Sequence, residues 1–256
     1  MFDFEWARGL DGLVTDGGTV QAGLLLRSGG RSNPGGVTFW PAGTHSYREV
    51  ALTRRLFAHH LNRSAHDLKM LQQVHGTRVV RRTTARGGNA ESDLPVADAQ
   101  FTTERGPVLI ANVADCCPVI IASLKPTIVG IAHAGWRGAA HGVVLRLLKE
   151  FGAAGASMAD LRCWVGPCAE ARRYEVGSDT ADHFASWPEA VALHAVDPSK
   201  RFLNVRAVTT AQLLQAGVTP QHVTVSLGGT IGDRRYHSHR RSQFAAGRMA
   251  AFVTVG

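Results

Sequence analysis

Three apolar segments follow one another closely in the middle of the chain. They cover residues 108–113, 118–123 and 127–132, are rich in Val, Ile and Leu, and are separated by only a few residues. Apolar runs of this length that end at turn residues are typical of buried strands. Because no helical segment separates them, these strands do not fit a fold in which strands and helices strictly alternate.

The remaining segments extend this pattern. Further strands are expected at residues 23–27, 77–82, 160–165, 221–227 and 249–254, and helices at 47–61, 138–151 and 205–216. The clearest helix is 138–151, where apolar residues recur at helical spacing before the stop signal Gly152. Strands outnumber helices, so we predict an α+β fold of mixed β-sheets flanked by helices. No long Pro- or Ser-rich linker interrupts residues 1–256, which predicts a single layered domain.

Composition excludes several classes of protein. The chain is 45% hydrophobic and 19% charged, which is typical of globular proteins and not of disordered or fibrous ones. Its longest apolar run, residues 108–123, is interrupted by Asp115 and is shorter than the roughly 20 residues of a membrane-spanning helix. The acidic and aromatic residues 1–6 lack the basic start of a signal peptide. We therefore expect a cytoplasmic protein with no membrane partner.

The net charge of +8 is typical of proteins that bind nucleic acids. However, the arginines are spread along the whole chain, and no helix-turn-helix, RNA-recognition or zinc-finger pattern accompanies them. We do not expect a nucleic-acid partner, although a basic nucleic-acid-binding module stays an alternative of a different class.

Three short stretches place reactive side chains beside glycine at the ends of predicted strands, where rigid scaffolds present functional groups. They are residues 71–76, 114–118 and 132–138, and they contain His75, Cys116 and His133. Two histidines and a cysteine match three protein ligands of a catalytic zinc ion with an open fourth position. The same residues would also serve a hydrolase with a cysteine nucleophile and a histidine base. The spacing of these residues in the sequence does not distinguish a zinc site from a cysteine hydrolase.

The four cysteines are expected to be reduced, because two of them are adjacent and four are too few for a disulfide framework. Side chains alternate along an extended backbone, so Cys116 and Cys117 should face different ways. We expect Cys116 to point into the site and Cys117 to be a small core residue. Cys163 and Cys168 are interpreted as structural residues.

A possible anion site lies at residues 135–138, directly before the clearest helix. Free main-chain N–H groups at a helix N-terminus attract anions, and Arg137 would add a positive charge beside Gly135. A plain glycine turn explains the same residues equally well. The His-x-His pair at 237 and 239 and the adjacent histidines at 59 and 60 are interpreted as structural.

At these motifs the sequence resembles a known family, variously named the YfiH-like, laccase-domain or polyphenol oxidase family, the peptidoglycan editing factor family and, in animals, the FAMIN family. The matching motifs occur in order at residues 27–32, 73–76, 97–99, 114–118, 133–138, 166–167, 174–177, 238–241 and 247–249. The string His-Ala-Gly-Trp-Arg-Gly at 133–138 is the most specific of them. Two departures are the absence of an Asn-Leu pattern in residues 36–46 and of a cysteine near residues 228–229.

The resemblance implies a fold related to that of deamidase toxins, which use Cys and His. It also implies that His75, Cys116 and His133 hold a zinc ion and are the catalytic residues. The small-molecule partners that it implies are purine nucleosides and phosphate. The implied reactions are phosphorolysis of adenosine, inosine and methylthioadenosine, and deamination of adenosine. For substrate or phosphate binding we expect Arg27, Ser32, Gly135, Arg137 and Arg241.

Two other chemistries stay open at this site. An amidohydrolase that edits peptidoglycan precursors would use Cys116 as its nucleophile. Multicopper oxidation needs several histidine pairs, and this chain has one His-x-His. Copper is therefore expected only as an adventitious substitute for zinc, because copper(II) outcompetes zinc at nitrogen sites.

Overall fold

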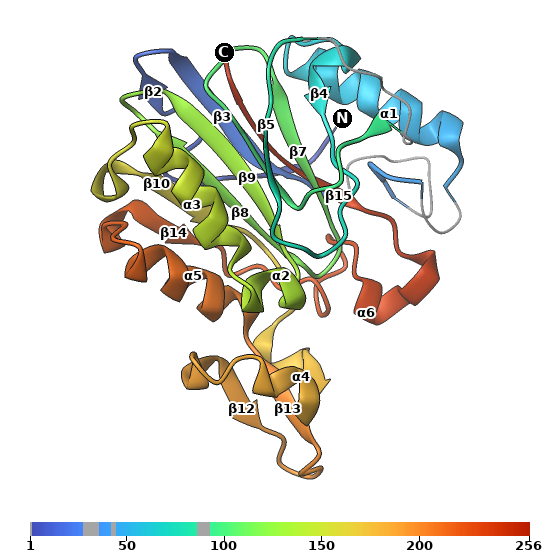
Figure 1. Cartoon of the computed structure of the whole chain (residues 1–256). Coiled ribbons are helices and arrows are strands. Elements are labelled where there is room, and N and C mark those ends of the chain that lie inside the picture. The colour runs from blue at the N-terminus through green and yellow to red at the C-terminus, as the bar shows by residue number, and fades with distance from the viewer. Residues whose placement is uncertain (1, 28–35, 42–44, 86–92) are drawn as a thin grey trace.

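The structure is a computed structural model that describes residues 2–27, 36–41, 45–85 and 93–256. It has an α+β fold built on three sheets (Figure 1). The first sheet has the order β1 (Phe4–Trp6), β3 (Gly18–Leu25), β15 (Met249–Val255), β7 (Val108–Val113) and β4 (Leu68–Lys69), and β2 (Val14–Thr15) pairs with β3. The second has the order β14 (Val223–Val225), β10 (Arg162–Val165), β8 (Cys117–Ser123), β9 (Ile128–Ala134), β6 (Ala99–Thr102) and β5 (Val79–Arg81).

Both large sheets are mixed, as the sequence predicted. In the first, β4 pairs with β7 in parallel, and in the second, β5 pairs with β6 and β10 with β14 in parallel, whereas the other pairs are antiparallel. The strands at 108–113, 118–123 and 127–132 are present as β7, β8 and β9 and are buried along their whole length.

The two large sheets face each other across a shared apolar core. Ile120 and Ile131 of the second sheet pack there with Leu24, Leu109 and Val253 of the first. Since side chains alternate along a strand, the other residues of β8 and β9 face outward from this core. Those residues are covered by helices α3 (Val143–Ala153) and α5 (Val205–Gln215). Helix α1 (Tyr47–His60) covers the outer face of the first sheet, which completes four layers (Figure 1).

The predicted helix 138–151 is divided in the structure. Helix α2 (Trp136–Ala140) ends before Gly142, and α3 begins after it. Gly142 has a φ of 76°, a left-handed conformation that glycine adopts without the penalty of a Cβ atom. The apolar spacing runs through this break, so periodicity predicted one continuous helix where there are two.

A third, antiparallel sheet was not predicted. It has the order β11 (Glu175–Gly177), β13 (Lys200–Leu203) and β12 (Val191–Leu193), and the short helix α4 (Ser178–Asp182) follows β11. Figure 1 shows it beyond one end of the two large sheets. A further short helix, α6 (His239–Ser242), precedes the last strand. In the part of the chain that the structure describes, no helix is long and apolar enough to cross a membrane.

Candidate metal centre

Strand register brings two of the predicted ligands to one end of the second sheet. Pro118 of β8 lies opposite His133 of β9, which places Cys116, in the turn before β8, beside that histidine. The loop that carries His75 joins them, so that the ligand atoms of the three residues all lie within 4.8 Å of one another. Cys116 Sγ is 3.6 Å from His75 Nε2. Within the described ranges, this is the only such group of three or more His, Cys, Asp or Glu residues.

Asp98 holds two of the three ligands in place. Its Oδ1 accepts hydrogen bonds from His133 Nδ1 and from the main-chain N–H of His75, both at 2.9 Å. Its Oδ2 accepts from the main-chain N–H groups of Gly76 at 2.7 Å and Val74 at 3.2 Å. Burial disfavours the ionised carboxyl group, but the hydrogen bonds outweigh this effect and keep the pKa of Asp98 below its usual value. A carboxylate behind a ligating histidine fixes the ring orientation and leaves Nε2 for the metal.

Glycine at residue 135 leaves the space that the side chains of His75 and Cys116 occupy. A Cβ atom there would lie 2.5 Å from Cδ2 of His75 and 3.1 Å from Sγ of Cys116. The φ of Gly135 is −68°, so its role is to leave space and not to adopt an unusual backbone conformation. His75 and Asp115, by contrast, have φ values of 62° and 86°, which are uncommon for residues with side chains and often mark functional sites.

The neighbouring rings make Cys116 acidic. Burial alone would raise the pKa of the Cys116 thiol, yet His133 and His75 stabilise the thiolate and lower this pKa to about 6. Burial alone would lower the pKa of His133. Cys116 and Asp98 stabilise its protonated ring instead and raise this pKa to about 9. The thiolate is the form of cysteine that binds metals and attacks electrophiles.

The three side chains suit a zinc ion. A set of two imidazoles and one thiolate is the ligand type of catalytic zinc sites that keep a fourth position open. The hydrogen bond between Asp98 and His133 is the supporting contact that such sites use. The same set would also accept copper.

Cys117 faces away from this centre, as the alternation of side chains predicted. Its Sγ is 3.8 Å from the carbonyl oxygen of Gly166 and 3.8 Å from Oγ1 of Thr209, inside the core under α5. A hydrogen bond with Cys168 and burial raise the pKa of Cys117 well above its usual value, so this thiol stays protonated. All four cysteines are free.

A pocket of about 490 Å³ adjoins the metal centre. His75, Cys116 and His133 form part of its wall. Its aromatic residues are Trp40, Trp136 and Tyr174, and its arginines are Arg137, Arg240 and Arg248. This volume lies in the range of small-molecule sites. Trp40 belongs to segment 36–46, one of the two regions that depart from the family motifs, so the divergence reaches the pocket wall.

The predicted substrate-binding residues lie in different places. Arg137 is on the pocket wall, where its guanidinium lies 4.2 Å from the centroid of the Trp136 ring. Gly135 precedes α2, but this helix has only five residues and is not the long helix expected after the glycine turn. Ser32 lies outside the described residues.

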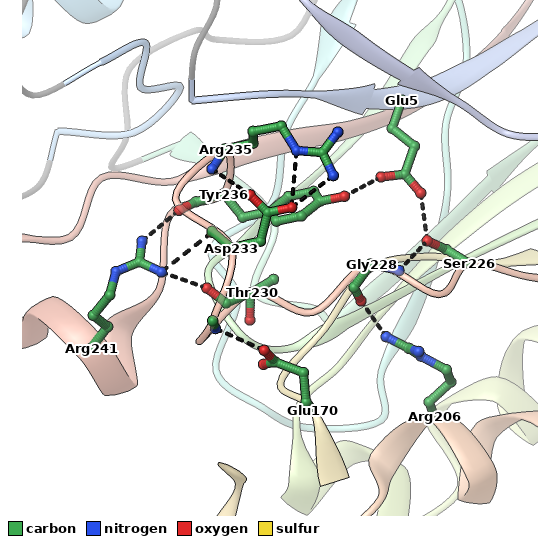
Figure 2. Close-up of polar contacts among 11 residues, drawn as sticks. Glu5, Glu170, Arg206, Ser226, Gly228, Thr230, Asp233, Arg235, Tyr236 and Arg241 are labelled. Carbon is green, nitrogen blue, oxygen red and sulfur yellow. Dashed lines mark hydrogen bonds and ion pairs between the residues drawn. The ribbon is translucent and has the colours of Figure 1, made fainter. Parts of the chain in front are cut away.

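Arg27 and Arg241 do not line the pocket. Arg241 donates hydrogen bonds to main-chain carbonyl groups, as Figure 2 shows. The acceptors are the carbonyl oxygens of Thr230, Ile231, Asp233 and Tyr236, at 2.6–3.3 Å. Arg27 is bound to the same loop, where its main-chain N–H donates to the carbonyl oxygen of Arg235 at 3.0 Å. Both arginines hold the loop in shape.

The sequence did not reveal the roles of Asp98, Arg240 or Arg248. Asp98 could have been noticed as an acidic residue directly before a short apolar segment. It was missed because residues 99–102 were not predicted to form a strand. The two arginines belong to recognised motifs, and only the folded chain distinguishes Arg240, on the pocket wall, from its neighbour Arg241.

Comparisons with known proteins identify the family of the chain. Residues 21–256 match the family described as multi-copper polyphenol oxidoreductase laccase. A purine nucleoside phosphorylase of Xylella fastidiosa strain Temecula1 is 35% identical over 191 residues, covering 73% of this chain and 71% of the relative. The purine nucleoside phosphorylase YlmD of Geobacillus stearothermophilus is 30% identical over 248 residues, covering 91% and 89%.

Two solved structures have the same fold. The crystal structure of YlmD from Geobacillus stearothermophilus superposes with a TM-score of 0.87 at 27% identity, covering 99% of this chain and 98% of that one. The crystal structure of the hypothetical protein YfiH from Bacillus licheniformis gives a TM-score of 0.83 at 26% identity, covering 93% of both chains.

Proposed function

The chain belongs to the laccase-domain family of purine nucleoside phosphorylases, and on this premise we propose that it is a zinc-dependent purine nucleoside phosphorylase that also deaminates adenosine. The observation that carries the proposal is the group His75, Cys116 and His133, whose ligand atoms lie within 4.8 Å of one another on the wall of a pocket. Adenosine, inosine and methylthioadenosine are the proposed nucleosides.

The pocket offers what phosphorolysis requires. An oxygen of phosphate forms a bond to ribose C1′ while the bond from C1′ to N9 breaks, and the electron pair leaves with the purine, which takes up a proton. The aromatic rings of Trp40, Trp136 and Tyr174 provide flat surfaces against which a purine can stack. Arginine side chains on the same wall would bind the phosphate oxygens.

Zinc held by the three ligands would act as a Lewis acid or activate a water molecule. The chain's own contribution is to orient the His133 ring and to stabilise the thiolate of Cys116. Asp98 accepts a hydrogen bond from His133 Nδ1, which directs Nε2 toward the site, and the two imidazoles favour the thiolate of Cys116. In the deamination reaction, water replaces the C6 amino group of adenosine and ammonia leaves.

A second candidate function also has geometric support. Cys116, His133 and Asp98 form a chain of nucleophile, base and orienting carboxylate, the arrangement used by cysteine hydrolases. In that case the protein would be an amidohydrolase acting on peptidoglycan precursors, and bound metal would be incidental. Activity that survives a strong chelator but is lost after alkylation of Cys116 would favour this alternative.

The test is chromatography of the products formed from adenosine by protein of known metal content, with and without phosphate. Adenine that forms only with phosphate supports phosphorolysis, and inosine in either sample supports deamination. If protein with a full equivalent of zinc forms neither product, the proposal is wrong. Muropeptide amides would then be the next substrates to assay.

A further inference from the structure

Three arginines line the pocket, and Asp115 is the one carboxylate among the described residues of its wall. Among the described residues, Arg137, Arg240 and Arg248 take part in no ion pair. The acid on the pocket wall is Asp115, and both of its oxygens are already bound. Oδ1 accepts from Thr230 Oγ1 at 2.5 Å and Oδ2 from the main-chain N–H of Arg240 at 2.6 Å. Even with the Asp115 carboxylate and the Cys116 thiolate on the same wall, the three guanidinium groups leave a surplus of positive charge that a bound anion would neutralise.

Arg248 is held rigidly at one edge of its guanidinium group. Its Nη1 donates to the carbonyl oxygens of Ala246 at 2.8 Å and Gly247 at 3.0 Å. Its main-chain N–H donates to Thr38 Oγ1 at 2.9 Å. The other N–H groups of the guanidinium have no protein partner among the described residues, and the side chain lies close enough to the Cys116 thiolate to be influenced by its charge. A fixed guanidinium with free donors is a ready partner for an oxyanion.

Arg240 is fixed in a different way. It follows the first residue of α6, and its main-chain N–H is bound by Asp115. Its guanidinium lies 5.0 Å from the centroid of the Tyr174 ring, and its Nη1 donates to the carbonyl oxygen of Glu175 at 2.9 Å. Asp115 is also the residue before Cys116, so one carboxylate links the position of Arg240 to the metal centre. Thr230, which binds the other oxygen of Asp115, belongs to the loop shown in Figure 2.

We propose that Arg240 and Arg248 together form the subsite for inorganic phosphate, and that Arg137 lies outside it. The inference rests on the proposed function for the identity of the reaction and extends it by naming the residues that bind the nucleophile. Both guanidinium groups are fixed by carbonyl oxygens before phosphate arrives, so little side-chain entropy is lost on binding. Arg137 and Arg240 are both exposed and both lie over an aromatic ring. However, the guanidinium of Arg137 donates no hydrogen bond to the described residues, so it is not fixed in the same way, and it borders the aromatic part of the pocket.

The test measures phosphate binding directly as well as catalysis. Inorganic phosphate is titrated calorimetrically into the zinc-loaded protein without nucleoside, and the phosphate KM is measured at saturating inosine. Arg240→Ala and Arg248→Ala should each weaken phosphate binding and raise the phosphate KM by roughly 10- to 100-fold, as expected for the loss of charge-assisted hydrogen bonds. The inosine KM should change less than about threefold, since a base stacked on aromatic rings does not use these donors.

Two further variants separate a binding role from a structural one. Arg248→Lys keeps the charge but loses the planar donors, so its phosphate KM should lie between those of the wild type and Arg248→Ala. Arg146→Ala removes the same charge from an exposed position on α3, away from the pocket, and should change neither constant. Circular dichroism confirms that each variant is folded.

The outcomes distinguish this inference from the proposed function. If the wild type forms ribose 1-phosphate and both alanine variants keep its phosphate affinity and KM, the subsite is wrong and the function stands. The subsite is equally wrong if Arg137→Ala alone abolishes phosphate binding. If the wild type binds phosphate through Arg240 and Arg248 but cleaves no nucleoside, the function is wrong and the subsite stands.

Discussion

Replacing Gly135 by alanine should damage the metal centre while leaving the fold intact. The new Cβ atom would lie 2.5 Å from Cδ2 of His75 and 3.1 Å from Sγ of Cys116. Carbon atoms in ordinary contact are about 3.5–4.0 Å apart, so the His75 ring must move by about 1 Å. Metal–ligand distances tolerate only about 0.2 Å. We therefore expect Gly135→Ala to weaken zinc binding by roughly 10- to 100-fold, the range seen when the support of a ligand is disturbed.

The assay is competition with a chromophoric chelator at pH 7, combined with urea unfolding of each protein. Gly142→Ala is the matched control, because Gly142 also precedes a helix but has a φ of 76° and lies outside the pocket lining. A side chain in that conformation costs about 1–2 kcal/mol of stability. Gly142→Ala should thus lose stability and keep its zinc affinity. Wild-type zinc affinity in Gly135→Ala would refute the reasoning, because the ligands could then separate without consequence.

Three further predictions follow from the contacts around the site. Asp98→Asn should weaken zinc binding by roughly 10- to 100-fold and lower phosphorolysis in parallel, as measured by chelator competition and initial rates; unchanged zinc affinity would contradict the role given to this carboxylate. Cys116→Ala should lose zinc and activity together, whereas Cys117→Ala should keep both and lose stability only, and equal losses of zinc by metal analysis would contradict the assignment. Burial lowers the pKa of His237 to about 4, below the 6.5 of an unfolded chain, so the unfolded state binds more protons between these values and stability falls as the pH drops through them. Between pH 7 and pH 4, the free energy of unfolding of His237→Gln should therefore fall by roughly 2–3 kcal/mol less than that of the wild type, as measured by urea unfolding. An identical fall in both proteins would show that His237 is not buried in its neutral form.

Strands β7, β8 and β9 could be predicted because their residues are apolar on both faces. Residues 108–113 form β7 with the bounds read from the sequence, since every residue of that strand is buried. The third sheet was missed because its strands are short and partly exposed; Leu193 of β12, for example, is 78% exposed. The division of the helix at Gly142 was missed because the apolar spacing continues across it.

The grouping of His75, Cys116 and His133 could be predicted because these reactive side chains stand beside glycine at strand ends. Their supporting residues depend on contacts between distant segments. Asp98 and His75 are joined only by a hydrogen bond across the fold, at 2.9 Å. Arg240 and Arg241 are neighbours in one motif, yet one lines the pocket and the other binds the carbonyl groups of a loop. Motif membership therefore does not assign a role to either residue.

The most direct test of the account is to follow phosphorolysis while zinc is returned to metal-free protein. Zinc is removed with a strong chelator, the protein is dialysed, and adenine release in the presence of phosphate is measured as zinc is added. The account predicts no activity without zinc and a linear rise that ends at one equivalent, with no rise for Cys116→Ala. Full activity in metal-free protein, lost only on alkylation of Cys116, would contradict it and favour the cysteine hydrolase.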